Sequence, residues 1–424
     1  MSALLQERPA VAPPTRAAFD PKAVRRQFPV FARNPGLVFL DTAASAQKPD
    51  CVIDGLAEYY RADYANVHRG VYGLSARSTA RFEAARDRVA QFLNAADASE
   101  IVFVRGATEG INLVAQAWGP AFLKPGDQIV VSELEHHSNI VPWQMLCHRL
   151  GTELVVAPID DGGALDLAAF AGLLTSRTRL VAMTHVANVT GGVVPVERVV
   201  QLAHAAGAKV LLDGCQAVPR LPVDVQALGC DFYVFSGHKC YGPTGIGVLY
   251  ARRAVLDAMP PWQGGGDMIR TVTFAETTYQ DAPQRFEAGT PDIAGAVGLA
   301  LALDFMDGLG MDAIREHEAA LTRHARSALS GLPGVTIVGA GAESVGVVSF
   351  EVDGLHPHDL ATIFDQHDVA IRAGHHCAQP LMDRLGLVAT ARASFGVYSD
   401  EDDVAALVAA VRAAQRLFGL VSAR

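Results

Sequence analysis

Short apolar runs alternate with helix-length segments over residues 101–250, and this alternation restricts the possible folds more than any other feature. Strands are expected at Ile101–Val104, Gln128–Ser132, Glu153–Ala157, Leu180–Thr184, Lys209–Asp213, Phe232–Phe235 and Ile246–Tyr250. Strands that are apolar throughout are typical of a parallel sheet covered by helices on both faces. The last strand is expected to pair antiparallel, because its connection is short. The pattern predicts an α/β fold around a mostly parallel, seven-stranded sheet.

The chain after Pro291 has a different pattern. Long helices are expected over 294–309 and 311–329, followed by short strands over 345–352, 369–372 and 390–397. Such a mixture is typical of a smaller α+β domain. We therefore expect an N-terminal segment that packs against this domain, and three parts in all: a lead-in over 1–32 whose first part is mobile, a large domain over 33–294, and a small C-terminal domain over 295–424.

Composition argues against several classes of partner. The formal net charge of −10 disfavours nucleic acid and an anionic membrane surface, and no apolar run is long enough to predict a membrane span. The first twenty residues lack the apolar core of a signal peptide, so a cytoplasmic protein is expected. The six cysteines are scattered without a C-x-x-C pair, which predicts neither a metal site nor a disulfide framework.

Polar side chains follow two of the expected strands, where α/β proteins bind ligands. Asp213 ends one strand, and Lys239 follows another in Ser-Gly-His-Lys. A buried carboxylate needs a partner, and a protonated pyridine nitrogen, which makes its ring an electron sink, is one candidate. Taken alone, Asp213 is interpreted equally well as a helix N-cap, and a lone Lys239 is better interpreted as a solvated loop lysine. The combination, with Lys239 26 residues after Asp213, is much more specific.

Two further turns are candidates for ligand contacts. The sequence RGATEGIN (105–112) places small residues and a helix N-terminus after a strand, where backbone N–H groups and the helix dipole favour a phosphate. The alternative is a capped helix start with Thr108 as the cap. His136 could stack on an aromatic ring and exchange protons near neutral pH, whereas His137 is expected to be structural.

Together these stretches resemble the class V aminotransferase branch of fold-type I pyridoxal-phosphate (PLP) enzymes, and within it the group II (SufS-like) cysteine desulfurases. The resemblance runs from about Phe28 to the C-terminus. It rests on NVHRG (66–70), RGATEGIN (105–112), ELEHHSNIVPW (133–143), DGCQAVP (213–219), FSGHKCYGPTGIGVLY (235–250), FEAGTPDIAG (286–295), RAGHHCAQPLM (372–382) and RASFGVY (392–398). It implies the PLP-dependent transferase fold type I, PLP as cofactor, and a homodimer with active sites at the subunit interface.

The resemblance also implies roles for individual residues. Lys239 would bind the cofactor aldehyde. The pyridine nitrogen, the ring oxygen and the ring face would be contacted by Asp213, Gln216 and His136. The phosphate would be held by the backbone of Ala107 and by Thr108, Ser236, His238 and, from the other subunit, Thr290. The substrate would be bound by Asn188 and Arg392, which take its carboxylate, and by Arg372 and His68. Ala107 departs from the family, which usually has a threonine there, and so does Cys215, which replaces an alanine.

Cys377 selects among PLP reactions. Its thiolate, favoured by His375, His376 and Arg372, would attack the sulfur of L-cysteine and carry it as a persulfide. The freed Lys239 would take the Cα proton, and L-alanine would be released. A buried, inert cysteine is the poorer interpretation, because the flanking histidines are not expected in a core.

The loop that carries Cys377 also bears on which protein receives the sulfur and on which other activities are possible. In the group that the chain resembles, the cysteine lies on a short loop, and few residues separate Arg372 from Arg392 here. The resemblance and this loop length together imply transfer to a dedicated acceptor protein of the SufE or SufU type, for iron–sulfur cluster assembly. A selenocysteine lyase or a cysteine sulfinate-acting relative would use the same residues and stays open. Another class V activity, such as a kynureninase or an epimerase, has no use for Cys377, and a non-catalytic scaffold would not need it either.

Overall fold

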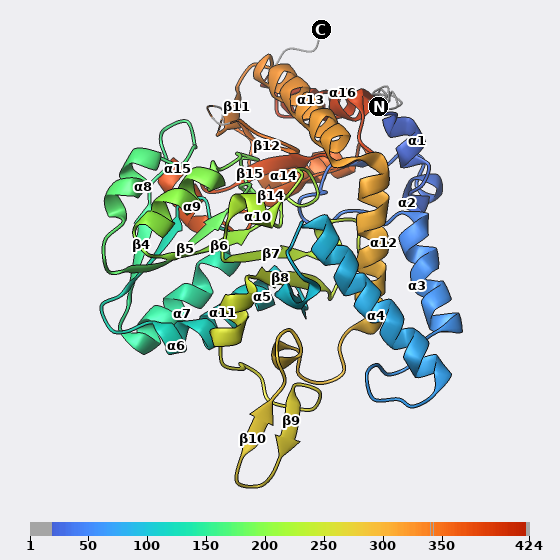
Figure 1. Cartoon of the computed structure of the whole chain (residues 1–424). Coiled ribbons are helices and arrows are strands. Elements are labelled where there is room, and N and C mark those ends of the chain that lie inside the picture. Colours follow the sequence, from blue (N-terminus) through green and yellow to red (C-terminus); the bar gives the residue numbers. More distant parts are fainter. Residues whose placement is uncertain (1–18, 340, 342, 421–424) are drawn as a thin grey trace, which may run out of the picture.

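Seven strands form the central sheet of the computed structural model, which describes residues 19–339, 341 and 343–420 (Figure 1). Their order is β2 (Ile101–Val104), β8 (Gly247–Ala251), β7 (Phe232–Ser236), β6 (Lys209–Asp213), β5 (Thr178–Thr184), β3 (Gln128–Ser132) and β4 (Glu153–Ala157). β8 runs antiparallel to both neighbours, and the other pairs are parallel. The predicted mostly parallel sheet is confirmed, including its antiparallel strand.

Alternate residues of these strands face two hydrophobic cores. Val130, Val181 and Val210 belong to the first core, with α3 (Asp50–Ala62), α4 (Gly73–Phe92), α8 (Leu167–Leu173), α9 (Val196–Ala205) and α12 (Ile293–Leu309). Ile129 and Leu180 belong to the second core, with α5 (Ala107–Leu113), α6 (Gly119–Phe122), α7 (Val141–Leu150) and α11 (Arg253–Ala258). Burial of both faces explains why the strands other than the edge strand β4, which is partly exposed, are apolar throughout.

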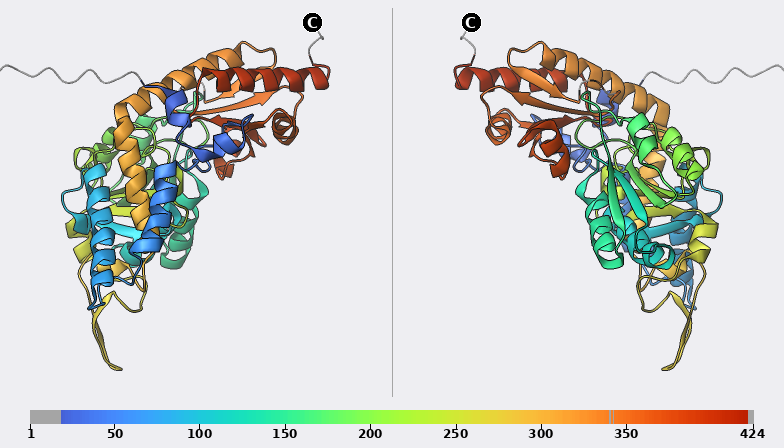
Figure 2. Two further views of the ribbon diagram at one scale, coloured as in Figure 1. Left: turned by 90° about the vertical axis from the view of Figure 1, so that its right-hand side faces the viewer. Right: turned by 90° about the vertical axis from the view of Figure 1, so that its left-hand side faces the viewer.

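A second sheet is built mainly from the C-terminal part of the chain. Its antiparallel order is β11 (Val335–Val338), β12 (Val347–Val352), β15 (Thr390–Ser394) and β14 (Arg372–Gly374). It packs with α13 (Met311–Ser330), α14 (Pro357–Asp365) and α16 (Glu401–Leu417). Figure 2 shows this sheet and its helices at one end of a bent molecule.

The N-terminal segment packs on this C-terminal part, as expected. β1 (Val38–Phe39) pairs in parallel with β13 (Val369–Ala370), so the strand expected over 369–372 is divided between two sheets. Two short helices, α1 (Pro21–Arg25) and α2 (Pro29–Arg33), precede β1, and Arg25 Nη1 lies 3.0 Å from Asp403 Oδ2. Helix α12 packs on α3 and α4, and the domain boundary near residue 295 stays a prediction. The first part of the lead-in, residues 1–18, lies outside the described residues.

A hairpin that the sequence analysis did not predict projects from the large sheet's side of the molecule (Figures 1 and 2). It consists of β9 (Ile269–Val272) and β10 (Thr277–Tyr279), and Phe274 at its tip is fully exposed. Two more short helices are α10 (Val225–Leu228), between β6 and β7, and α15 (Gln379–Leu385), between β14 and β15. A π-helical turn over Val114–Trp118 joins α5 to α6.

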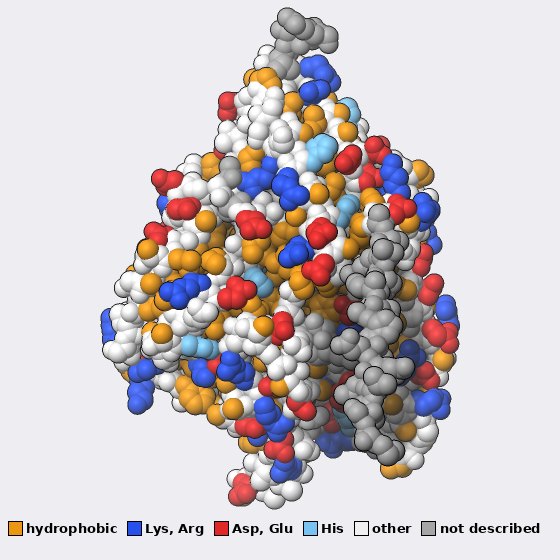
Figure 3. Space-filling model, turned by 45° about the horizontal axis from the view of Figure 1, so that its top comes forward, with side chains coloured by type: hydrophobic (Ala, Val, Ile, Leu, Met, Phe, Trp, Pro, Cys, Tyr) orange, Lys and Arg blue, Asp and Glu red, His pale blue; other side chains and the backbone are white. Residues whose placement is uncertain are grey.

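Charge is mixed over the face drawn in Figure 3, where acidic and basic side chains are interspersed. In the described part of the chain, no single helix combines the length and apolar composition of a membrane span. Helices α12 and α13 meet that test together, but only as a pair bent by 76°.

Candidate active site

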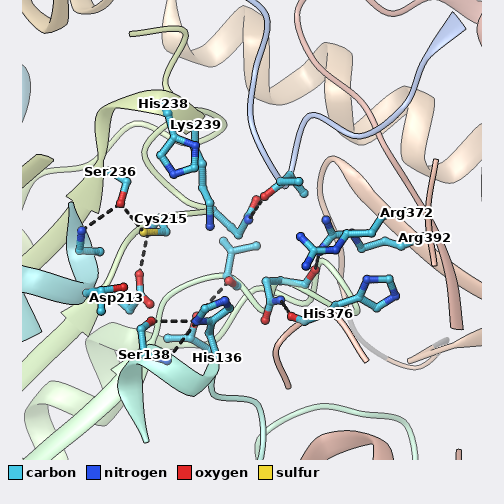
Figure 4. Close-up of a pocket in the computed structure, with 18 residues that line it drawn as sticks. His136, Ser138, Asp213, Cys215, Ser236, His238, Lys239, Arg372, His376 and Arg392 are labelled. Carbon is cyan, nitrogen blue, oxygen red and sulfur yellow. Dashed lines mark hydrogen bonds between the residues drawn. The ribbon is translucent and has the colours of Figure 1, made fainter. Parts of the chain in front are cut away.

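The carboxyl ends of the central strands open into a cavity of 190 Å³ (Figure 4). Many of the residues predicted for the site line it: Ala107, Thr108, His136, Asn188, Asp213, Gln216, Ser236, His238, Lys239, Arg372 and Arg392. Figure 4 shows Asp213 and Lys239 on one side and the two arginines on the other. Cys377, Thr290 and His68 do not line the cavity. The sheet brings together residues that are far apart in sequence, because its parallel strands end at one edge.

Asp213 ends β6 with its carboxylate buried in the cavity wall. Its Oδ1 accepts a hydrogen bond from Cys215 N at 2.9 Å, and the described residues provide no ion pair for it. A buried carboxylate without a cation is costly, so a positively charged ligand atom would be favoured there. A protonated pyridine nitrogen fits this position.

The start of α5 forms the opposite type of subsite, one for an anion. Ala107 N donates to Ser236 Oγ at 2.9 Å, which links α5 to the end of β7. A Cβ atom at Gly247 would lie 2.5 Å from Gly106 Cα, so the two segments can meet only with glycine there. Gly106 is the N-cap of α5, and Thr108 lies in the first turn rather than at the cap. Backbone N–H groups, the dipole and the Ser236 hydroxyl together suit a phosphate.

Lys239 ends a short 3₁₀ turn, Gly237–Lys239, directly after β7. Lys48 holds this turn, because its Nζ donates to the carbonyl oxygen of His238 at 3.0 Å. Burial lowers the pKa of Lys48 to about 8. The His238 ring lies 3.2 Å from Ser45 Oγ through Nδ1, and burial lowers its pKa to about 4.

His136 is uncharged at neutral pH. Burial lowers its pKa to about 3, and the nearby Lys239 charge acts in the same direction. Its Nδ1 accepts a hydrogen bond from Ser138 N at 3.1 Å, which assigns the ring proton to Nε2. A neutral, fixed ring is suited to stacking on a cofactor. Burial disfavours the charged ring, and the expected proton exchange near neutral pH stays a prediction.

The two arginines and Asn188 form the other side of the cavity. Arg392 is fully buried; its Nη1 donates to the Asn188 carbonyl oxygen at 2.8 Å, and its Nη2 lies 3.4 Å from Asp41 Oδ1. Within the described residues, Arg392 Nε and Asn188 Oδ1 have no hydrogen-bond partner. Burial lowers the pKa of Arg392 to about 10, with the Arg372 charge adding to the effect. Buried donors beside two positive charges would favour a ligand carboxylate.

Cys377 lies at the edge of this arginine side, half-buried, with Sγ 3.8 Å from Arg372 Nη2. His376 and Cys377 have φ values of 51° and 56°, in the left-handed region that non-glycine residues rarely adopt. Their carbonyl oxygens accept hydrogen bonds from Asn188 Nδ2 and His137 N, both at 2.7 Å. His137 is therefore structural as predicted, and its Nε2 also accepts from Gln379 N at 3.0 Å.

One expectation about the Cys377 loop is wrong. His376 is buried, with its Nε2 2.9 Å from Thr390 Oγ1. Burial lowers its pKa to about 3, and the charge of Arg392 contributes. The ring lines the cavity but is buried and neutral, so it cannot stabilise a thiolate by charge. Arg372 is the cation in contact with the sulfur.

Thr290 and His68 lie away from the cavity of their own chain. Thr290 lines a separate hollow of 310 Å³ with Trp262 and Glu287. His68 Nε2 lies 2.8 Å from Glu83 Oε1, and this contact raises the pKa of His68. Both predicted roles would therefore require a second subunit.

Glu135 supports the site and was not predicted. Its buried carboxylate accepts hydrogen bonds from Ser132 Oγ at 2.5 Å, Asn139 Nδ2 at 2.6 Å and Thr184 N at 3.0 Å. Burial raises its pKa to about 7. It fixes the turn that carries His136 to the end of β5. The available signal in the sequence was a glutamate three residues after the apolar strand β3.

Comparisons with known proteins agree with this site. The Aminotransferase class-V family matches residues 38–407. A cysteine desulfurase of Klebsiella pneumoniae is 52% identical to the chain, and the match covers 95% of the chain and 100% of the relative. A cysteine desulfurase of Dickeya dadantii is also 52% identical, and the match covers 93% of the chain and 97% of the relative.

Solved structures show the same relationship. The cysteine desulfurase CsdA of Escherichia coli, in an S-sulfonic acid form, has a TM-score of 0.88 and 42% identity, over 95% of this chain and 100% of its own. The apo cysteine desulfurase of Thermococcus onnurineus has a TM-score of 0.89 and 39% identity, over 93% and 97%. The predicted fold and family are confirmed: the chain belongs to the class V aminotransferase family and, within it, to the cysteine desulfurases.

Proposed function

We propose that the chain is a PLP-dependent cysteine desulfurase, a sulfurtransferase that converts L-cysteine to L-alanine and holds the sulfur as a persulfide on Cys377. The observation that carries this function is the position of the Cys377 thiol. Its Sγ lies 3.8 Å from Nη2 of Arg372, a residue that lines the cavity opposite Lys239 and Asp213. A transaminase or epimerase has no use for a thiol there. The relatives named above, at up to 52% identity, are cysteine desulfurases.

The cavity fits PLP at both ends of the cofactor. The unpaired Asp213 carboxylate would hold the pyridine nitrogen, and Gln216 would reach the ring oxygen. The phosphate would bind at the start of α5, at Ala107 N and the Thr108, Ser236 and His238 side chains. PLP, when bound, withdraws electrons from the substrate Cα and so makes its proton removable. The neutral His136 ring would lie on the cofactor face.

The chain's own groups carry the remaining steps. Arg392 Nε, which has no other partner among the described residues, and the second N–H of Asn188 Nδ2 would donate to the substrate carboxylate. Arg372 and His68 would line the substrate side. Lys239 would carry the proton removed from Cα. Cys377 Sγ then forms a bond to the substrate sulfur as the substrate Cβ–S bond breaks. Cβ keeps that electron pair and takes a proton, which gives alanine.

The assembly and the sulfur acceptor are also part of the proposal. A homodimer would bring Thr290 and His68 of one chain to the cavity of the other, which agrees with their distance from their own cavity. The Cys377 loop is short and held by hydrogen bonds from Asn188 and His137. We therefore expect a docked acceptor protein of the SufE or SufU type, in the cytoplasm, to collect the persulfide sulfur for iron–sulfur cluster assembly.

The test is L-alanine formation from L-cysteine by the holoprotein, with sulfide measured after addition of a reductant. Replacing Cys377→Ser should leave the visible band of bound PLP unchanged and lower both products at least about a hundredfold, because the nucleophile is lost. Cys51→Ser, on the exposed face of α3, is the matched control and should behave as wild type.

The outcomes separate the alternatives. Undiminished alanine formation by Cys377→Ser would overturn the thiol mechanism. Alanine from L-selenocysteine without any from L-cysteine would identify a selenocysteine lyase instead. Lys239→Ala should lose the visible band, because the amine that binds the cofactor aldehyde is removed; a surviving band would overturn the cofactor assignment.

A further inference from the structure

A buried ion pair lies behind the cofactor cavity, between the turn that follows β6 and helix α13. Arg220 and Glu318 are each 1% exposed, and Arg220 Nε lies 3.1 Å from Glu318 Oε2. Burial raises the pKa of Glu318 to about 7, and the Arg220 charge opposes this rise. Neither side chain lines the cavity, and the proposed reaction uses neither directly.

The surrounding backbone is shaped to accommodate this pair. Gly346 has φ +68°, and a Cβ atom there would lie 2.1 Å from Arg220 Nε and 2.5 Å from Glu318 Oε2. Thr322 Oγ1 accepts from Gly346 N at 2.8 Å and donates to the Glu318 carbonyl oxygen at 2.6 Å, which ties the two segments together. Buried ion pairs rarely add net stability, so stability alone does not account for this one.

The pair reaches the cavity through Gln216. Arg220 Nη1 donates to Gln216 Oε1 at 2.8 Å and to the Gln216 carbonyl oxygen at 3.1 Å. At the other end of the amide, Gln216 Nε2 donates to the Ala43 carbonyl oxygen at 2.8 Å. Gln216 and Ala43 both line the cavity. A continuous chain of polar contacts therefore runs from α13 to the cofactor site.

These contacts allow one orientation of the Gln216 amide. A guanidinium group only donates hydrogen bonds, so the group facing Arg220 must be the amide oxygen. The carbonyl of Ala43 only accepts, so the group facing it must be the NH₂. A reversed amide would oppose donor to donor and acceptor to acceptor. One NH₂ hydrogen is used by Ala43, and the second remains for a ligand in the cavity.

We propose that Arg220 is a positioning residue that keeps the Gln216 NH₂ directed toward the ring oxygen of PLP, and that Glu318 keeps Arg220 in place. The inference rests on the function proposed above, because the ring oxygen belongs to PLP. An N–H donor stabilises that oxygen when it is anionic, and so lowers the pH at which the bound chromophore loses its proton. Arg220 would thereby tune the chromophore through Gln216, without touching it.

The test is a pH titration of the visible absorption of the holoprotein. The double variant Arg220→Met, Glu318→Leu removes both charges and preserves packing volume. Its chromophore pKa should rise by about one unit, the effect of losing a hydrogen bond to a charged oxygen. Gln216→Leu should produce the same rise, and adding it to the double variant should produce none, because the two changes remove one interaction. Arg220→Lys, which retains a donor and the charge, should stay close to wild type.

The possible failures are distinguishable. A wild-type protein that develops no visible band with PLP would overturn the proposed function and this inference with it. If wild type shows a normal band, and the chromophore pKa shifts in Gln216→Leu but not in the double variant, the inference alone is overturned. A chromophore pKa that Gln216→Leu does not change would also overturn the inference alone. If the double variant does not fold, Arg220→Met can be compared with wild type at pH 6. There the Glu318 carboxyl binds a proton and no unpaired charge is buried, so the ratio of the two absorbing forms gives the same answer.

Discussion

Several histidines of this chain are held uncharged by burial. The pKa falls to about 3 at His136 and His376, and to about 4 at His185 and His238. Each of these rings is neutral across the physiological range and can stack or accept hydrogen bonds there. In the unfolded chain histidine titrates near 6.5, so at acidic pH protons bind the unfolded chain first and the free energy of unfolding falls.

His185 offers the cleanest test of this effect. Its ring Nδ1 lies 2.9 Å from the Tyr233 hydroxyl, and burial is the cause of its low pKa. Between pH 8 and pH 5 the unfolded ring gains a proton and the folded ring does not, so folding stability falls by about 2 kcal/mol at pH 5. His185→Gln should remove this loss. Urea unfolding of both holoproteins at pH 8 and pH 5, at one protein concentration, should show the variant gaining about 2 kcal/mol relative to wild type. A pH-independent difference would contradict the assignment.

At the level of single residues, the sequence predicted where side chains lie in the fold better than it predicted which of them are charged. Asp213 and Lys239 each follow a buried strand, so the sheet edge brought them together as expected. The neutrality of His376 was not predictable, because it results from burial against Thr390, which only the folded chain provides. Arg220 was missed for the same reason: its partner Glu318 is far along the sequence.

At the level of elements, the Cys377 loop is the segment on which sulfur transfer would depend. Two of its residues, His376 and Cys377, have left-handed backbone conformations. Three hydrogen bonds connect the loop to other segments: Asn188 Nδ2 donates to His376 O, His137 N donates to Cys377 O, and Gln379 N donates to His137 Nε2. Strained backbone of this kind persists only where surrounding contacts maintain it.

Removing one of these contacts should loosen the loop. His137→Ala deletes the acceptor for Gln379 N and should make Cys377 react about fivefold faster with iodoacetamide, since one hydrogen bond contributes about 1 kcal/mol to keeping the loop closed. Mass spectrometry can follow Cys377 and use the exposed Cys51 as an internal reference. His148→Ala, an exposed position on α7, should leave the rate as in wild type. Equal rates in both variants would show that His137 does not restrain the loop.

The elements that the sequence predicted best are strands with continuous apolar runs. β2, β3, β4 and β6 begin and end at the predicted residues, because continuous apolar runs mark them. The β9–β10 hairpin was missed because most of its side chains are exposed and give no apolar period. The strand over 369–372 was predicted as one, and its division between β13 and β14 depends on pairing with β1, a tertiary contact.

At the scale of the whole molecule, the single chain leaves two of the predicted site residues away from the cavity. Thr290 and His68 were predicted for the site and lie outside it. The hairpin projects far from the rest of the fold, with Phe274 and Val272 exposed, and Val71 and Tyr72 are exposed near the start of α4. Exposed apolar side chains on projecting segments are typical of an association surface. A second copy of the chain would account for both observations.

Subunit mixing tests whether Thr290 acts across that interface. Thr290→Val removes a hydroxyl donor to the cofactor phosphate and should weaken PLP affinity about tenfold, whereas Lys239→Ala removes the amine of its own cavity. In a mixed dimer, one cavity would carry both defects and the other neither. Co-expressing the two variants with different tags and purifying the mixed species should therefore restore wild-type PLP affinity and alanine formation at one cavity per dimer. If Thr290 acted within its own chain, each cavity would carry one defect, and the mixed dimer would show no cavity with wild-type affinity. A species that sediments as a monomer at all concentrations tested would likewise contradict the dimeric site.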